Sequence, residues 1–186
     1  TLQERLRGQL DNIFSEIEGK EITDKWELLR WVAVASAYEA RLPYQELRNM
    51  VAKPTLMGKL LTQLEEEYLV RRSEDGHYIE GLHAIRSRIL VQLMIENDPF
   101  LWNETAQQIL PILPELDLQP FILNAFIDRT DSEQSAFLDY LTSFYPSGWA
   151  GCAGIMRCLL WVGVRNYIEA NRALLNKIEN DLVRVW

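Results

Sequence analysis

The side chains best suited to acid–base or metal chemistry are few in this chain of 186 residues. The only histidines are His77 and His83, and the only cysteines are Cys152 and Cys158. Two cysteines are too few for a disulfide scaffold or for a zinc site of their own, and two histidines exclude a histidine-rich metal site. Most acid–base schemes would need His77 or His83. We therefore predict no metal site in this chain.

The sequence motifs of common catalytic sites are also missing. No phosphate-binding loop of the GxxxxGK[ST] type occurs, and the nearest pair, Gly58-Lys59, falls inside a predicted helix with no strand before it. The patterns HExxH, paired CxxC and GxSxG do not occur either. We therefore predict that this chain has no catalytic residues of its own.

His83 has the clearest candidate binding role, because it follows Gly81-Leu82 and opens a predicted helix. The free backbone N–H groups and the dipole at a helix start attract anions. An imidazole at that position can donate a hydrogen bond to a phosphate oxygen. The alternative is a histidine that caps its own helix or fills a gap beneath the preceding hairpin, and local chemistry alone favours this alternative.

The charge balance argues against a nucleic-acid backbone as the main partner. The chain has 19 Lys and Arg against 27 Asp and Glu, a net charge of −8 at pH 7, whereas nucleic-acid binding needs a positive surface. Hydrophobic residues at 48% and charged residues at 25% are typical of a folded protein and exclude intrinsic disorder.

The start of the chain and its most apolar window bear on the cellular location of the protein. The chain begins with Thr1 and has no signal segment, so we expect an internal piece of a larger polypeptide. The most apolar window, 155–164, is interrupted by Arg157 and is too short to span a membrane. Nothing requires an oxidising compartment, and we expect a cytoplasmic protein with no membrane partner.

In the first half of the chain, apolar residues have the spacing of helices except in one stretch that has the spacing of strands. A helix is predicted over 2–18, Gly19 interrupts it, and Thr23 or Asp24 is expected to cap the next helix. The elements that follow are predicted as helices over 24–39, 44–51 and 53–67, a β-hairpin over 68–79 that turns at 74–76, and a helix over 83–94. This order is typical of a winged helix-turn-helix.

The second half is predicted to be helical throughout. Prolines, Pro120 among them, are expected to mark joints between helices over 103–110, 119–129 and 132–144, and a long helix or helical hairpin is expected over 149–186. The predicted fold is therefore mainly α: a winged helix-turn-helix (three helices plus a β-hairpin) followed by an α-helical, solenoid-like region.

Small and aromatic residues near the C-terminus favour packing over chemistry. Gly148, Gly151 and Gly154 allow helices to approach closely. Cys152 and Cys158 lie six residues apart, which places them on different faces of a helix. The aromatic residues of this region are expected in the core or at an interface: Trp149, Trp161, Tyr167 and Trp186.

DNA binding by the predicted winged helix is not expected. Its third helix contains three residues that could contact DNA, Lys53, Lys59 and Gln63, but it ends in three glutamates, at 65–67. The one basic cluster combines Arg71 and Arg72 on the hairpin with arginines at 86 and 88. We expect Arg71 and Arg72 to pair with the three glutamates.

The run LEEEYL at 64–69, the hairpin, and Gly81-Leu82-His83 leading into IRSRIL at 85–90 together resemble the winged-helix domain of STAND NTPases. In these signal-transduction ATPases a histidine ends the wing, often within a Met-His-Asp triplet, and contacts the β-phosphate of bound ADP. Here the triplet is Leu82-His83-Ala84. The segment 26–36 together with GLHAIRS resembles the bacterial antiviral members, the Avs group.

The resemblance implies an organisation and a function. It implies the end of a helical, lid-like segment over 1–22, a winged-helix domain over 23–96, and a helical linker or sensor-side region over 97–186. His83 would contact the cofactor, ADP or ATP with Mg, which residues upstream in the parent ATPase would mainly bind. The partners would be the upstream nucleotide-binding domain, further copies of the active protein as a homo-oligomer, and a phage protein as the trigger.

Two other functions remain open on the sequence. An acidic, aromatic-containing helical region also suits a winged-helix scaffold for protein–protein interaction. A DNA-binding regulator is the third possibility, which the charge disfavours. The resemblance favours a non-catalytic regulatory segment that holds the ADP-bound resting state and relays sensor binding to oligomerisation and effector activation in antiphage defence.

Overall fold

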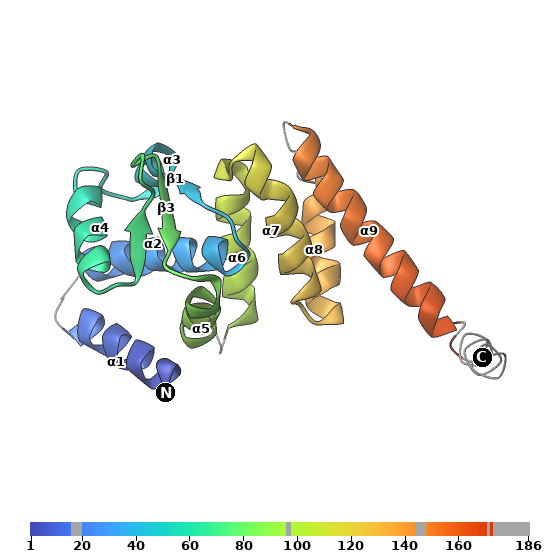
Figure 1. Cartoon of the computed structure of the whole chain (residues 1–186), viewed down its shortest axis with the longest axis horizontal. Helices are drawn as coiled ribbons and strands as arrows, with labels where there is room; N and C mark the ends of the chain where they lie inside the picture. The colour runs from blue at the N-terminus through green and yellow to red at the C-terminus, as the bar shows by residue number, and fades with distance from the viewer. Residues whose placement is uncertain (16–19, 96–97, 144–147, 171, 173–186) are drawn as a thin grey trace, which may run out of the picture.

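The structure is a computed structural model that describes residues 1–15, 20–95, 98–143, 148–170 and 172. Within these ranges the chain is mainly helical, as predicted, with one small three-stranded sheet (Figure 1). One hydrophobic cluster runs through the described part of the chain, from Leu6 in the first helix to Cys158 in the last.

The first two helices follow the predicted helical stretches, with a different start for the second. Helix α1 spans Leu2–Ser15; its Leu6, Leu10 and Ile13 are buried and Leu2 is exposed. Residues 16–18 of the predicted helix lie outside the described residues. Helix α2 spans Lys20–Ala37, so Thr23 and Asp24 lie inside it and the predicted capping role is wrong. The helix begins earlier because nothing in residues 20–23 opposes helical geometry.

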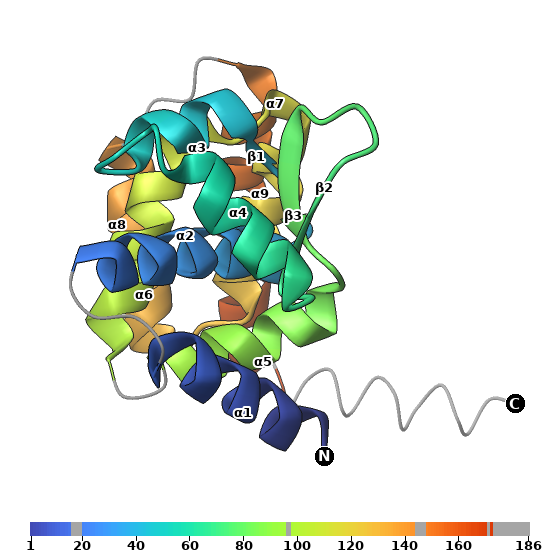
Figure 2. The same cartoon turned by 90° about the vertical axis from the view of Figure 1, so that its left-hand side faces the viewer.

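Helix α2 is the central element of the first half. Its apolar residues are buried on nearly every side, and it packs on α5 (Ala84–Ile95), on α6 (Pro99–Ile109) and on strand β3. Figure 2 shows α1 and α5 below α2 and the short helix α3 above it. The helix α2 therefore fixes the relative positions of the sheet and of the helices that follow.

The sheet is antiparallel with the order β1-β3-β2. Strand β1 (Leu42–Pro43) leads into α3 (Tyr44–Met50) and α4 (Met57–Glu66), followed by β2 (Val70–Arg72) and β3 (Tyr78–Gly81). The predicted turn is present, with Gly76 at a φ of 71° that favours glycine. Strand β1 was not predicted, because two residues carry no recognisable alternation.

Helix α4 begins at Met57 rather than at the predicted residue 53. Val51 is extended, at a ψ of 132°, and Pro54 accepts a turn hydrogen bond from Met57 N, so the chain turns before the helix starts. The inward face of α4 buries Leu60, Leu61 and Leu64.

The second half consists of α6, the 3-10 turn η1 (Leu110–Ile112), α7 (Glu115–Ile127), α8 (Asp131–Ser143) and α9 (Trp149–Ala170). Helix α6 begins earlier than predicted because the Asp98 carboxylate accepts from Phe100 N and Leu101 N, at 3.1 and 3.2 Å. Pro120 lies inside α7, so its predicted place at a joint is wrong.

The last helix packs closely on α7. A Cβ at Gly154 would lie 3.2 Å from Ile122 Cβ, which confirms that glycine allows this close approach. Cys158 is buried and Cys152 is exposed, so the prediction that they face different ways is confirmed. Helix α9 is continuous through Ala170, and the predicted helix beyond 172 lies outside the described residues.

Trp149 and Trp161, two aromatic residues of α9, are not in the core. Trp149 is 69% exposed and Trp161 is 46% exposed, and they share the surface of α9 with Met156, Leu160 and Val164. The side chain of Tyr167 and all of Trp186 lie outside the described residues. Among the described helices, none has the length and apolar character needed to cross a bilayer.

Candidate functional site

His83 lies at the junction between β3 and α5, on the rim of a surface hollow of about 310 Å³. The imidazole is exposed. The hollow is bounded by the C-terminal end of α2, the chain before β1, the two hairpin strands and the start of α5. The residues that face it include Ser36, Arg41, Arg71, Glu80 and Gly81.

Gly81 brings the end of β3 against α2. Its backbone N–H donates a hydrogen bond of 2.7 Å to Ser36 Oγ. A Cβ at this position would lie 3.1 Å from Ser36 Cβ and would overlap Ser87 Oγ. The absence of a side chain at Gly81 is therefore what lets the strand end close to α2 and fixes where His83 begins the next helix.

The side chain of His83 caps α5. Its Nδ1 accepts a hydrogen bond of 3.1 Å from the backbone N–H of Ile85, and its carbonyl oxygen accepts from Ser87 N at 3.0 Å. The capping role considered from the sequence is therefore confirmed. Because Nδ1 is the acceptor, the neutral imidazole carries its proton on Nε2, which has no partner among the described residues.

Two arginines border the hollow, and each is paired with a carboxylate. Arg71 Nε lies 2.9 Å from Glu80 Oε1. Arg41 makes three hydrogen bonds to Asp117 on α7: its backbone N and its Nε donate to Oδ2 at 3.0 Å each, and Nη2 donates to Oδ1 at 3.1 Å. The hydrogen bonds to Asp117 raise the pKa of Arg41 further above its ordinary value. The hollow is therefore nearly neutral in charge.

The predicted pairing of the hairpin arginines is confirmed for one residue and wrong for the other. Arg72 Nε lies 3.1 Å from Glu65 Oε1 on α4, as expected. Arg71 pairs with Glu80 instead, because these residues are direct partners in the β2–β3 register. The arginines at 86 and 88 donate to the carbonyl oxygens of Tyr68 and Ala37 and pair with no glutamate among the described residues.

The structure does not bring the two histidines together. His77 lies in the exposed hairpin turn, where its backbone N–H donates to Asp75 Oδ1 at 2.9 Å, and it faces a different hollow from His83. In the ranges that the structure describes, no three His, Cys, Asp or Glu side chains are grouped in a way that could hold a metal ion.

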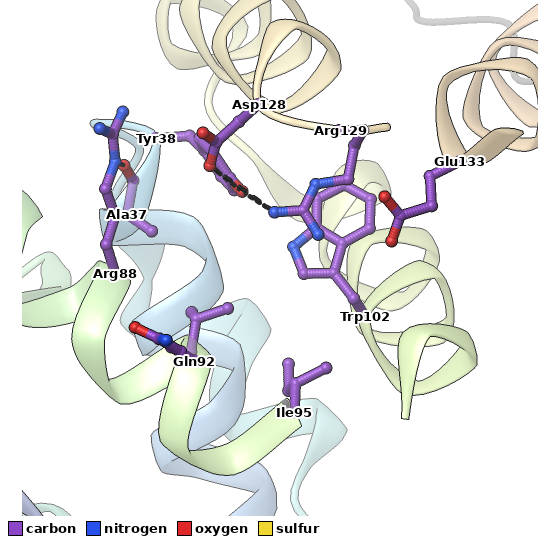
Figure 3. A pocket seen from close by; sticks show the side chains of 10 residues that line it. Ala37, Tyr38, Arg88, Gln92, Ile95, Trp102, Asp128, Arg129 and Glu133 are labelled. Carbon is purple, nitrogen blue, oxygen red and sulfur yellow. Dashed lines mark hydrogen bonds and ion pairs between the residues drawn. The ribbon is translucent and has the colours of Figure 1, made fainter. Parts of the chain in front are cut away.

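A cluster that the sequence analysis missed joins α2 to the end of α7. The hydroxyl of Tyr38 donates to Asp128 Oδ2 at 3.1 Å and accepts from Arg129 Nη2 at 2.8 Å (Figure 3). The guanidinium of Arg129 lies over the ring of Trp102, 4.4 Å from its centroid. Burial raises the pKa of Tyr38 to about 12. No local signal exposes this cluster, because about 90 residues of chain separate Tyr38 from its partners.

Comparisons with protein-family models, with curated proteins and with solved structures found no match.

Proposed function

We propose that this chain is a non-catalytic regulatory segment of a STAND-type NTPase switch, in which residues 23–96 form a winged helix. The arrangement α2-β1-α3-α4-β2-β3, with the strand order β1-β3-β2, supports this proposal. In a winged helix the third helix is followed by a hairpin whose second strand pairs with the short first strand. Here β3 pairs with both β1 and β2.

The observation that carries the proposal is the state of His83. Its Nδ1 is engaged by the backbone of α5, which leaves Nε2–H as an exposed donor beside the helix start. This is the side of the ring that a phosphate oxygen of ADP would need. Upstream residues of the parent would hold most of the nucleotide and the Mg, and His83 would add one contact from the regulatory segment.

Such a contact works as a switch only through differential binding. ADP stabilises the closed arrangement when His83 contacts the phosphate there and loses this contact in the open one. Binding of a trigger to the sensor side would then favour the open arrangement, oligomer assembly and effector activation. In this proposal α6 to α9 connect the winged helix to the sensor.

The competing function is a scaffold for protein–protein interaction, and one observation favours it. The apolar side chains exposed along α9, among them Trp149, Met156, Leu160 and Val164, are of the kind found at protein interfaces. A DNA-binding regulator has less support, since Arg71 and Arg72 are both paired with glutamates.

The test uses the full-length polypeptide that carries this chain, purified without added nucleotide, denatured, and analysed by chromatography for bound nucleotide. We expect one ADP per chain. His83→Ala should speed ADP release about tenfold or more, since it removes a hydrogen bond to a charged group. His77→Ala is the matched control and should release ADP at the parent rate. A nucleotide-free protein contradicts the switch and favours the scaffold, and unchanged release by His83→Ala contradicts the role of His83.

A further inference from the structure

A second cavity, of about 350 Å³, lies where the first half of the chain meets the second (Figure 3). It is separate from the hollow beside His83. Helices α2 and α5 form one wall, and α6, the end of α7 and α8 form the other. The polar side chains around it are Tyr38, Arg88, Gln92, Trp102, Asp128, Arg129 and Glu133.

Two buried hydrogen-bond donors in this cavity have no partner. Trp102 is 1% exposed, and its Nε1–H has no acceptor among the described residues. Arg129 Nε is also buried and without an acceptor in the described part of the chain. Figure 3 shows the nitrogen-bearing edge of Trp102 turned toward the space between Arg129 and Gln92. A buried N–H left without an acceptor costs about 1–3 kcal/mol, so native proteins nearly always supply a partner for such a group.

The wall also carries acceptors, but none of them accepts from Trp102 Nε1 or Arg129 Nε. Asp128 accepts from the Tyr38 hydroxyl, and Glu133 accepts from both the backbone N–H and the hydroxyl of Thr130, at 2.9 and 2.6 Å. By contrast, Arg88 uses only its Nε, which donates to Ala37 O at 3.2 Å, and within the described ranges its terminal nitrogens have no partner. Trp102 Nε1, Arg129 Nε and the terminal nitrogens of Arg88 are therefore the donors that a bound group could use.

The remaining surface of the cavity is apolar. Val91 and Ile95 of α5 line it together with the Trp102 ring, which the Arg129 guanidinium covers. A ligand that suits this combination has one group rich in acceptor oxygens and a small hydrophobic body. Arg88 and Arg129 favour a negative charge on that group, and the carboxylates of Asp128 and Glu133 in the same lining offset part of this effect.

We propose that this cavity binds a small organic anion through a carboxylate or phosphate group, which accepts hydrogen bonds from Trp102 Nε1, Arg129 and Arg88. The ligand would contact α5 on one wall and α6 and the end of α7 on the other, so its binding would hold the two halves of the chain together. This proposal is independent of the function of His83 and of any bound nucleotide.

The test follows the indole N–H signals of the chain by ¹H–¹⁵N NMR. The chain has six tryptophans, and the Trp102 signal is identified by its loss in Trp102→Phe. Benzoate and phenyl phosphate are added at constant ionic strength, and benzyl alcohol serves as the uncharged analogue. We expect one or both anions to move the Trp102 signal saturably and benzyl alcohol to leave it unchanged. Which anion binds more tightly identifies the carboxylate or the phosphate as the preferred group.

The chain provides internal controls. Trp31 Nε1 already donates to Gln108 Oε1 at 2.7 Å, so its signal should stay in place. Arg88→Gln should weaken anion binding about fivefold or more, whereas Arg86→Gln, on the same helix but bonded to Tyr68 O, should change it less than twofold. A Trp102 signal that does not respond, that follows benzyl alcohol equally, or that responds alike in both arginine variants overturns the proposal and indicates that water occupies the cavity.

Discussion

Replacing Asp117 by Asn tests whether the Arg41–Asp117 contact holds the second half of the chain against the first. Asp117 lies on α7 and its carboxylate is 10% exposed, whereas Arg41 lies just before β1 and its side chain is 41% exposed. Asparagine has nearly the same volume but no charge, and one of its two terminal groups is a donor. The substitution therefore removes the Nη2–Oδ1 hydrogen bond and places two donors against each other.

The size of the effect follows from these contacts. Hydrogen bonds to charged groups are worth about 1.5–3 kcal/mol each, but asparagine can keep an oxygen for the backbone N–H and Nε of Arg41. Water can also reach the half-exposed guanidinium and replace part of the loss. We expect the free energy of unfolding to fall by about 2 kcal/mol, which lowers Tm by about 4–8 °C for a chain of this length.

The assay is thermal unfolding followed by circular dichroism at 222 nm. Glu80→Gln is the matched control, because it breaks the more exposed Arg71–Glu80 pair with the same carboxylate-to-amide change. Such surface pairs contribute less than about 1 kcal/mol, so this control should lower Tm by less than about 4 °C. An Asp117→Asn variant that melts within 1 °C of the parent, or no lower than Glu80→Gln, would refute the reasoning.

Three further predictions follow from buried groups. The free energy of unfolding should fall as pH rises from about 10 to about 12, because Tyr38 ionises near pH 10 when unfolded and near 12 when folded. In urea unfolding, the free energy of unfolding of Tyr38→Phe should fall by about 2–3 kcal/mol less than that of the parent over this pH range. Gly81→Ala should lower stability by about 1–3 kcal/mol, because the added methyl group would overlap Ser87 Oγ on α5 and press against Ser36 on α2, whereas Gly58→Ala, with open space around it, should not. In thiol titration with an aromatic disulfide at pH 8, Cys152 should react at once and Cys158 only after unfolding, because burial raises the pKa of the Cys158 thiol to about 12.

Each of these predictions would be contradicted by a specific experimental result. Parallel loss of stability in Tyr38→Phe and the parent above pH 10 would show that this hydroxyl is not protected from ionisation. Equal Tm values for Gly81→Ala and Gly58→Ala would mean that β3 does not need its close approach to α2. Two thiols reacting at the same rate in the folded protein would place Cys158 at the surface.

The sequence predicted the parts of the fold that depend on local pattern. Helices α4 and α5 have the three- and four-residue apolar spacing of one-sided burial, α2 has a dense apolar run, and Gly76 requires a turn between the two strands of the hairpin. The start of α6 was misplaced because the prediction did not use the Asp98 cap. Pro120 was expected at a joint between helices but lies inside α7, because the tertiary packing of α7 outweighs the cost of a proline inside the helix.

The candidate sites also divide into those that a local pattern predicts and those that depend on contacts between distant residues. His83 was found because its position after the hairpin is a local feature, and its bond to Ile85 N involves a residue only two positions away. The bond from Arg41 to Asp117 and the contact of Tyr38 with Arg129 join residues about 76 and 91 positions apart. Long-range pairs of this kind are specified by how α7 and the residue after it dock against the segment between α2 and β1, and one sequence carries no direct signal for that docking.

The two edges of the small sheet limit how this chain can associate with others. At one edge, β1 contains Pro43, which has no N–H to offer a further strand. At the other edge, two of the three residues of β2 are the exposed arginines Arg71 and Arg72, and placing an added strand there means accommodating their charges. Both edges are thus protected against intermolecular β-pairing. A partner of this chain would bind through helical surfaces or loops, and edge-to-edge aggregation of the folded protein is disfavoured even at high concentration.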